Sequence, residues 1–191
     1  MGISCCSRVR LDEHRAVERK APKPVSTRCA GELRNAGPVV IEREFPDAAA
    51  DVAFAGFKLW VHGRGHPEAT DFWDGNWFRI TAAYLTPHFI AICEDNILHG
   101  SDVASSLEAA CRMYETLDGD FTFATLEPGF DLHFSARQHG RIDLEANFVT
   151  DGLRREEYRN LIEIDQSYLP AFIRGPRLVL SRFPLVGEST D

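Results

Sequence analysis

Residues 121–148 read FTFATLEPGFDLHFSARQHGRIDLEANF, and their pattern indicates the class of fold. Apolar residues occupy alternate positions in three short runs, a period that is typical of strands with one buried face and one solvated face. Two short turns, Glu127-Pro128-Gly129 and Gln138-His139-Gly140, separate the runs and suit antiparallel neighbours. The stretch therefore predicts three antiparallel strands.

The flanking sequence adds further strands and two helices. Apolar or alternating runs predict strands over 39–41, 52–61, 77–85, 89–93 and 162–164. A helix that Ser101 or Asp102 caps is predicted next, because apolar residues recur every three or four positions from Val103 to Leu117. A final helix begins at Ser167, and Gly175-Pro176 within it predicts a kink or a break. The predicted fold is α+β, a mostly antiparallel β-sheet of about seven or eight strands with two α-helices packed on its apolar face.

The chain has 191 residues and 44% hydrophobic residues, which suits one domain with a substantial core. Residues 1–37 are polar, contain proline and have no period, so they are predicted to be a disordered extension or the product of a start codon placed too early. A single α+β domain is expected over 38–187, followed by a short tail over 188–191.

The charge is unevenly distributed along the chain. The formal net charge is −8, but residues 1–37 carry eight Lys and Arg against four Asp and Glu, so the rest of the chain carries −12. Such an acidic domain is unsuited to coating nucleic acid phosphates, and it favours a basic partner instead.

Cysteine usage and hydropathy indicate the compartment. The five cysteines are odd in number and have no metal-type spacing, which is typical of reduced thiols. No apolar run approaches the roughly 18 residues of a membrane span, and no signal-peptide core is present. A cytoplasmic protein is expected.

Motifs for catalysis are sparse. The sequence has no GxSxG element and no phosphate-binding loop, so no catalytic residue and no cofactor are expected. One alternative is a small metal-dependent hydrolase that uses the His62-His66 loop with Asp71 or Asp74. Glycines and a proline in that loop disfavour the helix on which such a spacing would work, and no metal site is assigned.

Two surfaces are candidates for binding a partner. The segment 71–78, DFWDGNWF, contains Trp73 and Trp77, which either form an aromatic binding surface or cover the core beside a turn. Strand alternation also predicts an open sheet face with five outward carboxylates against one arginine, Arg141, which either binds a basic protein or is a solvated face kept charged for solubility. These carboxylates are Asp131, Asp143, Glu145, Glu163 and Asp165.

Several segments together resemble a known family. They are DFWDGNWF over 71–78, YETLDG over 114–119, FTFATLE over 121–127, IDQSYLP over 164–170, and Phe183-Pro184 followed by Gly187. In this order they resemble the WapI family of bacterial immunity proteins over roughly residues 55–187. Residues 1–37 have no counterpart, and Gly175-Pro176 interrupts a closing helix that is continuous in the family.

The resemblance implies a small cytoplasmic antitoxin. Its partner would be the C-terminal toxic domain of a polymorphic toxin, an RNase that acts on tRNA, and the family has no catalytic residues to transfer. The rival hypotheses are the hydrolase above and an orphan protein-interaction module without a toxin. The seven expected partner-binding residues are the five carboxylates together with Trp73 and Trp77.

Overall fold

The computed structural model of the chain describes residues 49–151 and 156–188. The predicted extension over 1–37, the predicted strand over 39–41, the start of the domain at residue 38 and the last three residues of the tail lie outside the described residues. The extension and the domain limits therefore stay predictions.

The described residues contain eight strands and two α-helices, joined by short 3-10 turns. The elements are β1 (Val52–Phe54), β2 (Phe57–Arg64), β3 (Trp77–Leu85), β4 (Ile90–His99), α1 (Gly100–Thr116), β5 (Asp120–Ala124), β6 (Phe130–Ala136), β7 (Arg141–Asp151), β8 (Glu156–Asp165) and α2 (Leu169–Arg182). The predicted α+β class, the antiparallel pairing and the two helices are confirmed.

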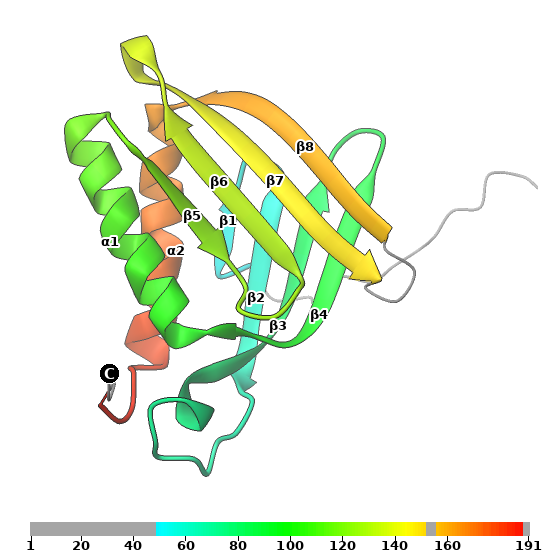
Figure 1. Cartoon of the computed structure of the whole chain (residues 1–191), viewed down its shortest axis with the longest axis vertical. Helices are drawn as coiled ribbons and strands as arrows, with labels where there is room; N and C mark the ends of the chain where they lie inside the picture. Colours follow the sequence, from blue (N-terminus) through cyan, green and yellow to red (C-terminus); the bar gives the residue numbers. More distant parts are fainter. Residues whose placement is uncertain (1–48, 152–155, 189–191) are drawn as a thin grey trace, which may run out of the picture. The chain divides into compact units, whose positions relative to one another are not determined.

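The strands form two sheets of four, where the sequence predicted one. The first sheet has the order β1-β2-β3-β4 and the second the order β5-β6-β7-β8, with neighbours antiparallel throughout. The chain passes from one sheet to the other through α1, so no hairpin joins them. Figure 1 shows the two sheets facing one another, with α1 and α2 side by side along one open side.

A single hydrophobic core lies between the sheets. Phe57 of β2 lies with its ring centroid 5.2 Å from that of Phe130 in β6, and Tyr84 of β3 lies 6.1 Å from Phe148 in β7. The helices close the side of this core, because the α2 residue Phe172 is fully buried with its ring 5.2 Å from Phe134 and 5.5 Å from Phe123.

Two predicted details of the helices are wrong. The N-cap of α1 is His99, whose imidazole accepts a hydrogen bond from the backbone N–H of Ser101. Asp102 lies three residues further on, where its carboxylate accepts from the His99 backbone N–H. The predicted break at Gly175-Pro176 is also absent, because α2 continues as one helix through both residues, with Gly175 buried against Val52 of β1.

Candidate protein-binding surfaces

The outward side chains of β6, β7 and β8, together with Arg137 in the adjoining turn, form what we call the charged face. The strand register places Asp131 beside Asn147, Ser135 beside Asp143, and Asp143 in turn beside Glu163. All five predicted carboxylates lie on this one side of the second sheet, as alternation requires. The complete set is Asp131, His133, Ser135, Arg137, Arg141, Asp143, Glu145, Asn147, Val149, Glu157, Arg159, Leu161, Glu163 and Asp165.

Arginines pair with three of the five predicted carboxylates. Arg137 Nε lies 2.7 Å from an Asp143 oxygen, Arg141 Nη1 lies 3.4 Å from Glu163, and Arg159 Nε lies 2.7 Å from Glu145. The prediction of a single arginine on this face was therefore wrong. Arg137 reaches it from the turn after β6, and Arg159 reaches it from the first half of β8; both lie outside the runs whose alternation was counted. The charged face holds six carboxylates and three guanidinium groups, so it keeps an excess of negative charge.

Local hydrogen bonds favour the ionised form of two of these carboxylates, Glu145 and Asp165. Hydrogen bonds from Arg159 and then Asn147 lower the pKa of Glu145, with the positive charge of Arg159 acting in the same direction. Hydrogen bonds from Ser167 lower the pKa of Asp165, whose carboxylate caps the turn that leads into α2 at 2.8 Å. Asp165 therefore has a structural task of its own.

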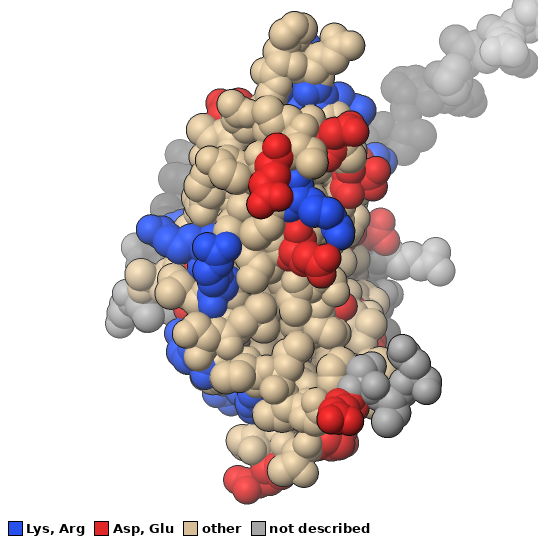
Figure 2. All heavy atoms as spheres, turned by 90° about the vertical axis from the view of Figure 1, so that its left-hand side faces the viewer, with Lys and Arg blue, Asp and Glu red and all other residues tan. Residues whose placement is uncertain are grey.

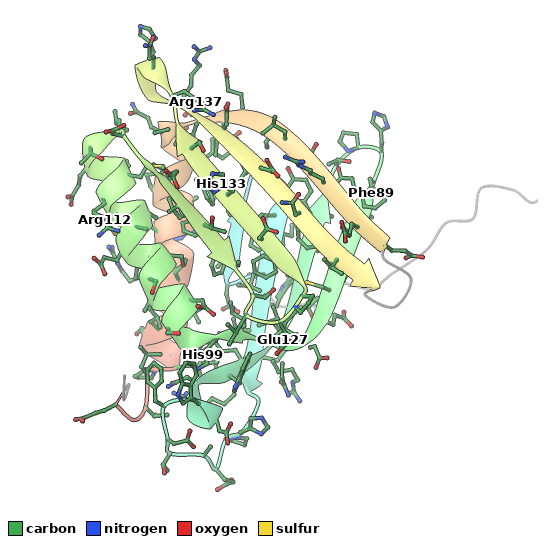
Figure 3. All side chains as sticks on the ribbon, in the orientation of Figure 1. Phe89, His99, Arg112, Glu127, His133 and Arg137 are labelled. Atoms are coloured by element: carbon green, nitrogen blue, oxygen red, sulfur yellow. The ribbon has the colours of Figure 1, made fainter. Side chains whose placement is uncertain are left out.

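His133 occupies the middle of the charged face (Figure 3). Its Nδ1 lies 3.0 Å from the Thr122 hydroxyl of β5, and its Nε2 lies 3.1 Å from the Ser135 hydroxyl. The register places it opposite Glu145 on β7. The imidazole is held by two hydroxyls and contributes a polar, orientable group between the carboxylates.

Leu161 is the residue that sequence reasoning missed. It lies on β8 opposite Glu145, in the charged face, and 65% of it is exposed. The alternation that turns Ile162 and Ile164 inward also turns Leu161 outward, so an apolar residue at a solvent position was the available signal. An exposed leucine beside charged side chains is suited to anchor a protein contact, since interfaces combine an apolar centre with a polar rim.

The segment over 71–78 folds as a compact loop that ends in a 3-10 turn. Asp71 accepts hydrogen bonds from the backbone N–H groups of Trp73 and Asp74, at 3.0 and 2.8 Å. Trp73 is 56% exposed and Trp77 is half-buried as the first residue of β3. The two predicted tryptophans therefore differ, and only Trp73 presents most of its surface to solvent.

Both tryptophans contact His99, which is fully buried. The His99 ring lies 5.6 Å from Trp73 and 5.4 Å from Trp77, and its Nε2 lies 3.2 Å from the Trp73 carbonyl oxygen. His99 thus joins the start of α1 to the loop (Figure 3). The loop is fixed in place, and Trp73 lies exposed on a rigid support.

The alternative metal site gains no support from the fold. His62 lies on β2, where its Nε2 is 2.9 Å from the Thr81 hydroxyl, and the Asp71 carboxylate is engaged in the loop. Over residues 49–151 and 156–188, no three His, Cys, Asp or Glu side chains are grouped as a metal ion requires. Neither of the helices in those ranges has the length and apolar character to cross a membrane.

An open sheet face with opposite charges around an exposed leucine is the kind of surface through which one protein binds another. The model of the immunity protein WapI-like family matches residues 51–184, and the chain belongs to this family. Its role is that of an immunity protein. Comparisons with curated proteins and with solved structures gave no match.

Proposed function

We propose that the protein neutralises the C-terminal nuclease domain of a cognate polymorphic toxin by forming a stoichiometric complex in the cytoplasm. The toxin domain would be a basic RNase that acts on tRNA, and the charged face would be the surface that binds it. The function is one of binding, without catalysis, as the family suggests.

The observation that carries the proposal is the excess of carboxylates over arginines on the charged face, in which Leu161 lies exposed. A nuclease must present positive charge to the phosphates of its substrate, and an acidic surface complements that charge. The same complementarity accelerates association, because the summed field guides the two proteins together. Long-range attraction brings the two proteins together, and Leu161 would then add an apolar contact to the complex.

The Arg141–Glu163 ion pair of the charged face is compatible with this role. The side chains of Arg141 and Glu163 are each more than half exposed, so their mutual attraction is screened by water and contributes little to folding. A basic partner can therefore take over carboxylates such as Glu163 at small cost.

The experiment compares two variants with the same change of charge. In the first, Asp143→Lys, Glu145→Lys and Glu163→Lys reverse the charged face. In the matched control, Glu68→Lys, Glu108→Lys and Asp118→Lys reverse three exposed acids of the loop before β3, of α1 and of the turn after it. Binding to the C-terminal nuclease domain of a candidate cognate toxin is measured by calorimetry across a series of salt concentrations.

The wild type should bind one to one, with an affinity that falls as salt increases because the Debye length shrinks from about 10 Å at 0.1 M to about 3 Å at 1 M. The first variant should lose at least roughly 100-fold in affinity, whereas the control should stay within about fivefold of the wild type. Equal losses in the two variants would reduce the effect to net charge and contradict a specific acidic interface.

Trp73 defines a second arm of the same experiment. Trp73→Ala removes the most exposed of the aromatic side chains in the loop, and a loss of affinity of roughly tenfold or more would extend the interface to this segment. Trp77 is half-buried, so it would contribute to binding indirectly, by helping to hold Trp73 in position.

A further inference from the structure

A groove of about 370 Å³ runs between α1 and α2, on the helical side of the molecule. Cys111 of α1 and Pro170 and Ile173 of α2 belong to its lining, and Tyr114 and Leu178 add apolar walls. The α2 residues involved follow a spacing of three and four positions, so they form one stripe along the helix. This stripe and the matching stripe of α1 give the groove the length of about two helical turns.

The walls of the groove are unusually exposed for apolar residues of two helices that pack together. Tyr114 is 49% exposed and Leu178 is 56% exposed, although Ile173 beneath them is buried. Single apolar residues scattered over a surface are common. Two exposed apolar residues that line one concave surface with a buried apolar residue as its floor are typical of a binding groove.

Two arginines of α2 make one rim of the groove positive, and Glu115 of α1 is the single acid in its lining. Among the residues that the structure describes, Arg174 and Arg177 form no ion pair, and the contact of Arg177 is with the Cys111 sulfur at 3.8 Å. By contrast, Arg182 at the end of the same helix pairs with Asp51 at 3.0 Å. Figure 2 shows basic side chains gathered on the left of the helical side, although the protein as a whole is acidic.

We propose that this groove binds an amphipathic helical segment of a partner protein, with carboxylates on the flank that faces α2. An apolar stripe on that segment would cover Tyr114, Ile173 and Leu178, as a third helix packed against two covers the seam between them. Its carboxylates would pair with Arg174 and Arg177, whose guanidinium groups can each hold a carboxylate through two hydrogen bonds. The site is separate from the charged face, and the proposal does not depend on the toxin.

The probe is an acetylated and amidated helical peptide of about 16 residues, with leucines at helical spacing, glutamates on one flank and a fluorophore at one end. A second peptide carries lysines in place of the glutamates. Binding to the full chain is followed by fluorescence anisotropy for the wild type, for Arg174→Glu with Arg177→Glu, and for Leu178→Glu. The matched control is Arg112→Glu, an exposed arginine of α1 that pairs with Glu108 outside the groove.

Cys111 provides an independent reading of where the peptide binds. The Cys93 thiol is buried, and burial raises its pKa to about 12, so it should resist alkylation. With Cys5→Ser, Cys6→Ser and Cys29→Ser in the background, iodoacetamide should modify Cys111 selectively. A peptide in the groove should slow that modification in proportion to occupancy.

The proposal expects the glutamate peptide to bind, the lysine peptide to bind at least roughly tenfold more weakly, and the double arginine variant to reverse that preference. Leu178→Glu should weaken binding, and Arg112→Glu should leave it unchanged. Equal binding of both peptides, no binding at all, or binding without protection of Cys111 would overturn the proposal. Self-association that Arg174→Glu abolishes would also overturn it, by assigning the groove to a second copy of this chain.

Discussion

At the scale of single residues, the side chain of Asn76 joins two distant segments of the chain through several hydrogen bonds. It is fully buried, and its amide donates to the carbonyl oxygens of Phe72 at 2.7 Å and Val186 at 2.9 Å. Its oxygen accepts from the Val186 backbone N–H at 3.0 Å and from Arg64 at 3.2 Å. Asn76 therefore ties the loop before β3 to the segment after α2, over 110 residues of chain.

Asn76→Ala should lower the free energy of unfolding by about 3 kcal/mol, because it leaves several buried backbone groups without partners. Asp74→Ala, at an exposed position two residues away, should change it by about 0.5 kcal/mol or less. Urea denaturation of both variants measures the difference. Similar values for the two would show that the loop contributes its stability through other contacts.

The motif over 71–78 accordingly has a structural meaning for each of its central residues. Asp71 closes the turn, Asn76 joins the two chain segments, and a side chain at Gly75 would lie 2.5 Å from Val186. The motif is therefore held against Val186, in the segment that follows α2. Trp73 is the exposed member that the structural tasks leave available for a partner.

At the scale of elements, α2 reverses an expectation from helix propensity. Gly175 lies inside the helix, where alanine would ordinarily be favoured by about 1 kcal/mol. A Cβ at this position, however, would lie 2.6 Å from Val52 Cγ2 and 2.8 Å from the Asp51 carbonyl oxygen in and before β1. The close approach of the helix to the strand requires glycine here.

Gly175→Ala should therefore lower the free energy of unfolding by about 2 kcal/mol, since overpacking against backbone outweighs the gain in propensity. Ser181→Ala, at an exposed position of the same helix, is the control and should be neutral or slightly stabilising. Thermal unfolding followed by circular dichroism measures both. A stabilised Gly175→Ala variant would contradict the close packing of α2 on β1.

The periods of the sequence predicted most elements, but the predicted strand over 52–61 is two strands, β1 and β2, which pair around a turn at Ala55-Gly56. Alternation placed the strands and their outward residues, and the spacing of three and four placed α1. The predicted N-cap of α1 was wrong because histidine is not a typical N-cap residue in a sequence pattern. His99 caps the helix through the backbone geometry at the end of β4. The continuity of α2 depends on β1, which is far away in the sequence.

At the scale of the whole molecule, the two sheets are joined by polar as well as apolar contacts. Asn160 of β8 donates a hydrogen bond to the hydroxyl of Tyr84 in β3 at 2.9 Å. Burial of Tyr84 raises the pKa of its hydroxyl, and the hydrogen bond from Asn160 opposes this in part. The neutral phenol is thus the form that the folded protein favours.

This raised pKa links stability to alkaline pH. Because the folded-state pKa lies above the unfolded value of about 10, the contribution of Tyr84 is fully present below pH 10 and is lost as pH rises through the folded-state pKa. Tyr84→Phe should cost about 1 kcal/mol at pH 7 through the lost hydrogen bond. The gap to the wild type should narrow above pH 10, as urea midpoints from pH 7 to pH 11 would measure.

Tyr114→Phe is the control for this series, because Tyr114 is half exposed on α1 and makes no contact between the sheets. Its unfolding curve should track that of the wild type at every pH. A constant gap between Tyr84→Phe and the wild type across the whole range would argue against the burial of the phenol.

The sequence by itself determined the class of fold, the antiparallel strands, the two helices and the outward direction of the five carboxylates. These follow from periods of two and of three to four residues, which are local properties of the chain and can be read without knowing what it packs against. Only the tertiary structure decided that the strands divide into two sheets, that Arg137 and Arg159 join the charged face, and that α1 and α2 leave between them a groove with one positive rim. Such features depend on contacts between residues that are distant in sequence. They are decided when the whole core packs, and no single segment of the sequence contains that information.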